Sequence, residues 1–116
     1  MRRDKFEELA RRAIERLPEE FQARLENVDI MVEDRPTAKQ RGRRGREILG
    51  LYEGVPQPER ENYNLALPDR ITLFQKPIES MGRTDEEIEV EIEHTIIHEI
   101  AHHFGIDDKQ LREMGW

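Results

Sequence analysis

The sequence predicts an α+β domain, and three observations support this class. An amphipathic helical pattern near the N-terminus is followed, within about thirty residues, by a run of β-forming residues. A second alternating run lies at residues 70–75, and a long capped helical pattern follows it. At 116 residues the chain has the length of one domain with a modest core. We therefore expect a single domain over residues 1–116.

Composition narrows the classes of function. Charged residues make up 39% of the chain and apolar residues 35%, and the net charge is −7, which argues against a general nucleic-acid binder. The chain has no cysteine, so any metal would be held by histidine and carboxylate side chains. No apolar run has the length of a signal peptide or a membrane span, so we expect a cytoplasmic protein without a membrane partner.

The N-terminal third predicts two helices and a strand. Residues 4–17 carry apolar side chains at helical spacing, and Asp4 is placed to cap the start. Pro18 ends this helix and opens a second, short one with Phe21 and Leu25 on its inner face. Residues 28–32 are rich in β-formers and predict a strand.

A basic segment follows. Residues 35–46 hold six basic residues, no acidic residue and no large apolar side chain, so residues 35–47 predict a flexible, exposed loop. This loop is the one hint of a phosphate or nucleic-acid contact. Because no aromatic side chain interleaves to stack on bases, a solvated loop is the preferred interpretation.

The middle of the chain predicts a second and a third extended segment. Residues 48–52 form a short apolar run, residues 60–67 give no clear assignment, and residues 70–75 alternate as a strand. If this last strand lies at a sheet edge it can pair with an extended peptide, and an ordinary sheet strand is the alternative. Residues 77–81 predict one helical turn.

The long helix begins at Thr84, which forms a capping-box pattern with Glu87, and ends at Gly105, a natural C-cap. The acidic residues between 85 and 93 suit the helix dipole and are interpreted as a solvated face. A helical wheel separates an apolar arc from a polar face. The arc holds Ile96, Ile97, Ile100, Ala101 and Phe104, and the polar face holds Glu91, His94, His98 and His102. One side therefore predicts core and the other a cleft. Residues 109–114 predict a final short helix.

The end of this helix carries the motif H-E-x-x-H, extended to H-E-x-x-H-x-x-G-x-x-D. His98 and His102 are four residues apart and stand on one helix face, where two imidazoles can bind one zinc ion. Glu99, between them, is placed as a general base that takes a proton from zinc-activated water and passes it to the leaving amine. For the third ligand we favour Asp108, because the chain reverses at the glycine, with Asp107 and Glu113 as alternatives.

Other polar residues near the motif have less definite roles. His103 points about 100° away from His102 on the wheel, so it is not expected to share the metal. Tyr52, Tyr63 and His103 are candidates for stabilising an oxyanion. His94 could assist the site or act as an alternative ligand, although a polar residue of the cleft is the preferred interpretation.

Five segments together resemble the mini-zincins, a bacterial family of small zincin-like metallopeptidases formerly described as a domain of unknown function. The segments are residues 13–18 with Phe21, 28–32, 49–54, 67–73 and 98–106, and the last contains the specific motif. The resemblance implies a small zincin-like fold with N-terminal helices, a small mixed sheet and a long active-site helix. It also implies His98, His102 and Asp108 as zinc ligands and Glu99 as catalytic acid/base.

The sequence therefore predicts a zinc-dependent metallopeptidase that acts on a peptide or protein substrate. One alternative is a zinc-dependent RNA hydrolase, whose known counterparts share the ligand spacing but resemble H-G-x-x-H with a third histidine. A second alternative is a non-catalytic zinc-binding or regulatory module.

Overall fold

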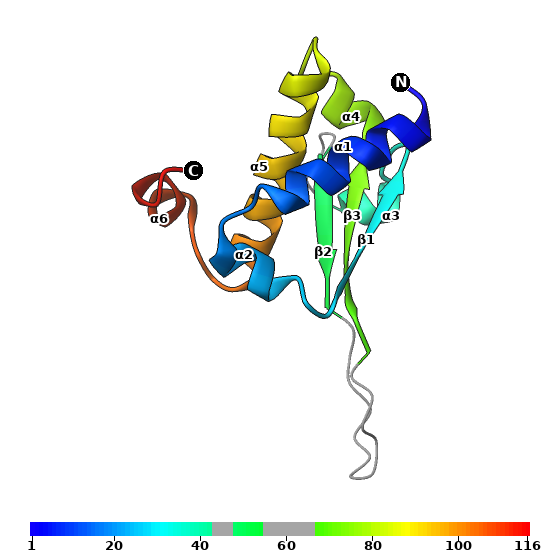
Figure 1. Ribbon diagram of the computed structural model, residues 1–116. Helices are drawn as coiled ribbons and strands as arrows, with labels where there is room; N and C mark the ends of the chain where they lie inside the picture. The colour runs from blue at the N-terminus through cyan, green and yellow to red at the C-terminus, as the bar shows by residue number, and fades with distance from the viewer. Residues whose placement is uncertain (43–47, 55–66) are drawn as a thin grey trace.

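The computed structural model describes residues 1–42, 48–54 and 67–116 of the chain (Figure 1). Within these ranges the elements are α1 (Arg3–Glu15), α2 (Glu19–Arg24), β1 (Val28–Glu33), α3 (Ala38–Arg41), β2 (Gly50–Glu53), β3 (Asp69–Phe74), α4 (Gln75–Glu79), α5 (Asp85–His103) and α6 (Asp108–Glu113). Helices and a small mixed sheet confirm the predicted α+β class. No helix in the described ranges is long and apolar enough to cross a membrane.

The three strands form one sheet in the order β1-β3-β2. β1 runs parallel to β3, and β2 runs antiparallel to it. β3 is therefore the central strand, with its hydrogen-bonding groups used on both sides. The suggestion that residues 70–75 form an edge strand for a peptide is wrong, because an alternating pattern shows which face is buried but not which strands lie beside it. The edge strand next to α5 is β2.

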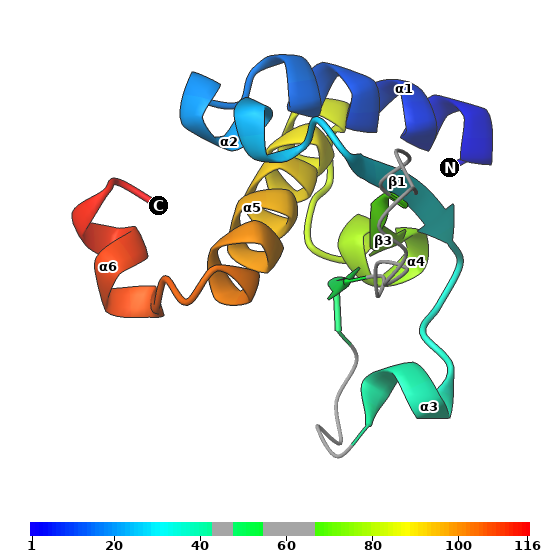
Figure 2. The ribbon, with the colours of Figure 1, turned by 90° about the horizontal axis from the view of Figure 1, so that it is seen from below.

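Helices α1 and α5 lie on the same face of the sheet and enclose the core between them (Figure 2). α1 contributes Phe6 and Ala13, and β3 contributes Ile71 and Leu73, all fully buried. Asp4 does not cap α1; Arg2 is the N-cap residue without a side-chain bond, and Asp4 lies in the first turn. Its carboxylate accepts instead from the Lys5 N–H at 2.9 Å.

Helix α5 has the predicted limits, but only one of the two hydrogen bonds of the predicted capping box is formed. The Thr84 hydroxyl accepts from the Glu87 N–H at 3.1 Å, but the Glu87 carboxylate accepts from the Arg83 N–H. On the apolar arc, Ile96, Ile97, Ile100 and Ala101 are all fully buried.

Phe104 departs from the prediction, because it is the C-cap residue and leaves the helical direction. The residue is 46% exposed, and the Arg24 guanidinium lies over its ring, 4.4 Å from the ring centroid. The acidic run is also not wholly solvated. Glu89 and Glu93 are buried, and Arg16 at the end of α1 forms ion pairs with both. A wheel drawn for one helix contains no information about a cation on another helix.

Two local assignments also differ. The expected basic loop contains one helical turn, α3, because Thr37 and Gln40 form a reciprocal capping box; residues 43–47 lie outside the described part of the chain. β3 ends at Phe74, and Gln75 begins α4 two residues before the predicted turn. The Gln75 side chain is buried, where it accepts from Arg3 Nε and donates to the Met1 carbonyl, each at 2.8 Å.

Candidate metal centre

The candidate centre is built where α5 ends. The Gly105 N–H donates to the His102 carbonyl at 3.2 Å, and the Ile106 N–H donates to the Ala101 carbonyl at 2.7 Å. Gly105 has a φ of +79°, which glycine adopts without strain and which turns the chain back toward α5. α6 begins immediately after this reversal, so its first residues face the last turns of α5.

The reversal brings three predicted side chains together. One ligand atom from each of His98, His102 and Asp108 lies within 4.8 Å of the others. His102 Nε2 and Asp108 Oδ1 are 2.9 Å apart, and the centroids of the two imidazole rings are 5.9 Å apart. Asp107 is not part of this cluster: its carboxylate accepts from the Gln110 N–H at 2.8 Å and caps α6.

The electrostatics of the cluster suit metal ligands. Burial, together with the neighbouring His102, lowers the pKa of His98 below its usual value, which favours a neutral imidazole. The hydrogen bond from His102 lowers the pKa of Asp108, which favours an ionised carboxylate. A neutral imidazole and a carboxylate anion are the forms that bind a metal, so the cluster is prepared for a cation.

The donor set fits zinc. Two imidazole nitrogens and one carboxylate oxygen are the ligands of many catalytic zinc sites, which keep a further position open for water or substrate. His102 and Asp108 are exposed and His98 is half-buried, so an ion held here would be reached from solvent. The structure therefore contains a group of residues able to hold a metal ion.

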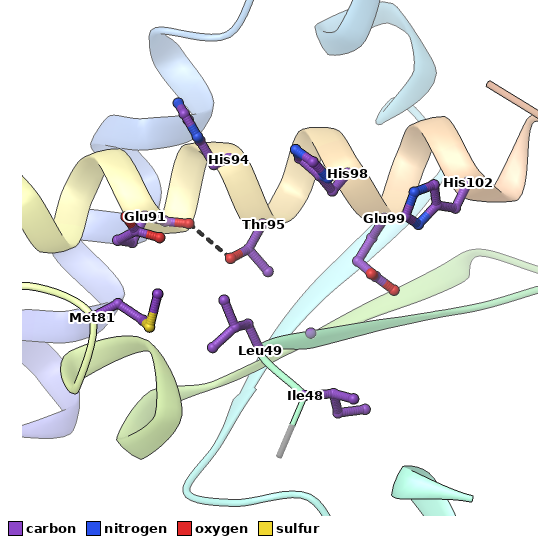
Figure 3. Close-up of a pocket in the computed structure, with 10 residues that line it drawn as sticks. Ile48, Leu49, Met81, Glu91, His94, Thr95, His98, Glu99 and His102 are labelled. Atoms are coloured by element: carbon purple, nitrogen blue, oxygen red, sulfur yellow. Dashed lines mark hydrogen bonds between the residues drawn. The ribbon is translucent and has the colours of Figure 1, made fainter. Parts of the chain in front are cut away.

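A groove with a volume of about 660 Å³ leads along α5 to this cluster (Figure 3). Apolar side chains from Ile48, Leu49 and Met81 form one wall, opposite Thr95 and His98 of α5. The groove is lined by Ile48, Leu49, Gly50, Met81, Glu91, His94, Thr95, His98, Glu99 and His102. The polar face predicted for the helix is thus one wall of a real cavity.

Glu99 points from α5 toward β2 at the cluster end of this groove (Figure 3). Its Oε1 accepts a hydrogen bond from the main-chain N–H of Tyr52 at 3.0 Å. A glutamate that faced bulk solvent would make no such contact, so the side chain has a defined position beside the candidate ligands.

The sequence model of the zincin-like metallopeptidases matches residues 25–116. The chain belongs to this family. A solved structure of a conserved hypothetical protein from T. thermophilus has 26% sequence identity and a TM-score of 0.56, over 87% of this chain and 92% of that one. No curated protein matches the chain. The family match confirms the resemblance to the mini-zincins and agrees with the small zincin-like fold.

In this zincin-like chain, two oxyanion candidates, Tyr52 and His103, pack on each other. The rings of Tyr52 and His103 stack with centroids 3.9 Å apart, and the Tyr52 hydroxyl donates to Asp69 Oδ2 at 2.7 Å. Burial and the Asp69 bond raise the pKa of Tyr52 to about 12. The third candidate, Tyr63, lies outside the described residues.

His94 lies in the groove of the zincin-like chain but outside the ligand cluster. Its ring meets the Trp116 ring edge to face, with centroids 5.5 Å apart, and it is exposed. This placement agrees with a polar residue of the cleft. The contact between Glu99 and the Tyr52 main chain was not predicted from the sequence. Every residue except proline has a main-chain N–H, so the identity of residue 52 does not indicate this donor.

Proposed function

We propose that this zincin-like protein is a zinc-dependent metallopeptidase, with His98, His102 and Asp108 as zinc ligands and Glu99 as general base. The observation that carries the proposal is the convergence of two imidazoles and a carboxylate at one end of a groove, with a second carboxylate beside them. Membership of the zincin-like metallopeptidase family supports the same reaction class.

Bound zinc would supply a Lewis acid that lowers the pKa of water toward neutrality and polarises a carbonyl oxygen. The protein's part is then to hold the metal and to move protons. Glu99 lies next to His98 on the helix and faces the groove, so it can take the proton from the attacking water and give it to the leaving amine.

The edge strand β2 supports a peptide as the substrate class. The Phe74 N–H donates to the Leu49 carbonyl at 2.9 Å, so in the antiparallel register Gly50 and Tyr52 direct their main-chain groups away from β3. The Tyr52 N–H is already bonded to Glu99 Oε1, so an extended peptide would pair with the main-chain groups of Gly50 and the carbonyl of Tyr52, beside the groove and the candidate metal site. The apolar wall of Ile48, Leu49 and Met81 offers room for an apolar side chain. A cytoplasmic location is part of the same proposal, and the acidic, cysteine-free composition is consistent with it.

The test replaces Glu99 by glutamine, which keeps the shape and removes the base. We expect peptide hydrolysis to fall by about 100-fold or more, since general acid–base catalysis contributes about 10²–10⁴-fold. Zinc content, measured by elemental analysis of the purified protein, is expected to stay at one ion per chain. Glu86→Gln, an exposed change in the first turn of α5, is the matched control and is expected to keep full activity.

Three results would contradict the proposal. Full hydrolysis by Glu99→Gln would remove the general-base role. Cleavage of RNA, with no cleavage of a peptide library, would favour the RNA-hydrolase alternative. A zinc-loaded wild type that cleaves neither substrate would favour a non-catalytic zinc-binding module.

A further inference from the structure

We infer that Tyr52 is a positioning residue for Glu99, acting through its main-chain N–H, and that Asp69 and His103 hold Tyr52 in place for this purpose. The inference rests on the proposed function, because it concerns how the general base of that reaction is held. It assigns a role to three residues that are neither metal ligands nor the base.

The first step is the bond to Glu99. The register of β2 turns the Tyr52 N–H away from β3, and this N–H donates to Glu99 Oε1 at 3.0 Å. A glutamate side chain has several freely rotating bonds, so a surface carboxylate samples many positions. A charge-assisted bond to a main-chain donor fixes one of its oxygens and restricts that motion.

The second step is the support of Tyr52 itself. Its hydroxyl donates to Asp69 at the start of β3, and one ring face packs on His103 with an interplanar angle of 19°. With a pKa raised to about 12, the phenol stays protonated and keeps donating throughout the neutral range. Tyr52 is therefore held at its hydroxyl by the central strand and at its ring by α5.

The third step is that the stack of Tyr52 on His103 links β2 to α5. Among the described residues, β2 is bonded to the sheet on one side only, so the sheet alone leaves the distance between β2 and α5 adjustable. His103 follows the candidate ligand His102 directly, so the stack joins the ligand-bearing turn of α5 to β2. A Cβ added at Gly54 would lie 3.5 Å from His103 Cε1 and 3.8 Å from Asp69 Oδ1, so the end of the strand rests against the same two residues.

A purely structural role for His103 fits less well. Its side chain is exposed and does not belong to the hydrophobic core cluster. Its removal is therefore expected to leave the folded core intact and to affect mainly the distance between α5 and the Tyr52 N–H. This difference can be measured.

The test is amide hydrogen exchange followed by NMR on the full zinc-loaded chain at neutral pH. The Tyr52 amide is expected to be protected in the wild type and to exchange about 10- to 100-fold faster in Glu99→Ala, as loss of a bond to a charged group implies. His103→Ala is expected to speed Tyr52 exchange by about tenfold. The Leu51 amide faces β3 in the register and is the internal control, which should stay protected in every variant.

The second arm measures turnover. His103→Ala is expected to lower kcat by about 10- to 100-fold, since a small misplacement of a reacting group has this effect. KM and zinc affinity are expected to be unchanged, and His103→Phe, which keeps an aromatic face, should restore turnover. Glu86→Gln, the exposed change in the first turn of α5, is the control and should keep full turnover.

The possible results distinguish a failure of this inference from a failure of the proposed function. Unchanged Tyr52 exchange in Glu99→Ala would overturn the inference, whether or not any peptide is cleaved. Loss of Leu51 protection in His103→Ala would also overturn it, by showing that the stack only holds the strand in the sheet. A wild type that cleaves no peptide while the exchange pattern is as expected would refute the proposed function and leave the contact established.

Discussion

At the scale of single residues, the candidate centre depends on the different roles of two adjacent aspartates, Asp107 and Asp108. Asp107 is the N-cap of α6, and its carboxylate accepts from the helix's own Gln110 N–H. Asp108 is the first helical residue, so its side chain is not needed for capping and lies 2.9 Å from His102 Nε2. Identical side chains thus receive different roles because one occupies a cap and the other does not.

This division gives a paired prediction. Asp108→Ala is expected to lower zinc affinity by more than about 100-fold, since loss of even an outer-shell partner costs about 10–100-fold. Asp107→Ala is expected to keep the affinity and to lower stability by about 1 kcal/mol, the usual cost of a lost N-cap. Zinc titration and thermal unfolding of both variants measure the two effects. If the variants exchange these results, Asp107 is the ligand.

At the scale of elements, the groove is set by the close approach of β2 to α5. A Cβ placed on Gly50 would lie 2.7 Å from Thr95 Cγ2 and 3.2 Å from the Thr72 carbonyl oxygen. Real side chains do not approach so closely, so glycine is what allows the edge strand to lie against the helix. Two positions further along the strand, Tyr52 then brings its N–H within reach of Glu99.

Gly50→Ala should therefore push β2 and α5 apart. We expect a loss of about 1–3 kcal/mol, the usual cost of overpacking, measured by urea unfolding. Thr95→Ser removes the methyl group in the way and keeps the hydroxyl that donates to the Glu91 carbonyl at 2.7 Å. The double variant should recover part of the loss. Strictly additive effects in this mutant cycle would show that the two groups do not meet.

At the scale of the whole molecule, the core and the candidate centre are separate. The core cluster is formed by buried side chains of α1, β3 and the inner face of α5, with Phe21 of α2, Ile78 of α4 and Leu111 of α6. His102 and Asp108 are exposed, and the ion pairs of Arg16 with Glu89 and Glu93 join α1 to α5 outside the ligand cluster. The fold therefore has a source of stability that does not include a metal.

The corresponding prediction concerns metal removal. After treatment with a chelator the protein should stay folded by circular dichroism, and His102→Ala should be folded but unable to bind zinc. Adding zinc at 100 times its Kd should stabilise the wild type by about 2.7 kcal/mol, as ligand linkage requires. A protein that unfolds in the chelator would instead have a structural metal, as zinc fingers do.

The features that could be predicted without a structure are local ones. The spacing of His98, Glu99 and His102, the apolar arc with Ile97 and Ile100, and the reversal at Gly105 all follow from helical geometry over a few residues. Together with the family motif they group the three candidate ligands, which the structure places within 4.8 Å of one another. The α+β class was predicted in the same local way, from β-forming runs at residues 28–32 and 70–75 beside helical patterns.

The long-range contacts, in contrast, became visible only in the folded chain. The fold makes β3 the central strand and β2 the edge, buries Glu89 and Glu93 beside Arg16, and joins Glu99 to Tyr52, 47 positions away in the chain. The physical reason is that hydrophobic periodicity shows only which face of a helix or strand is buried. Which elements become neighbours depends on how all the elements pack together, and this cannot be determined from one stretch of sequence.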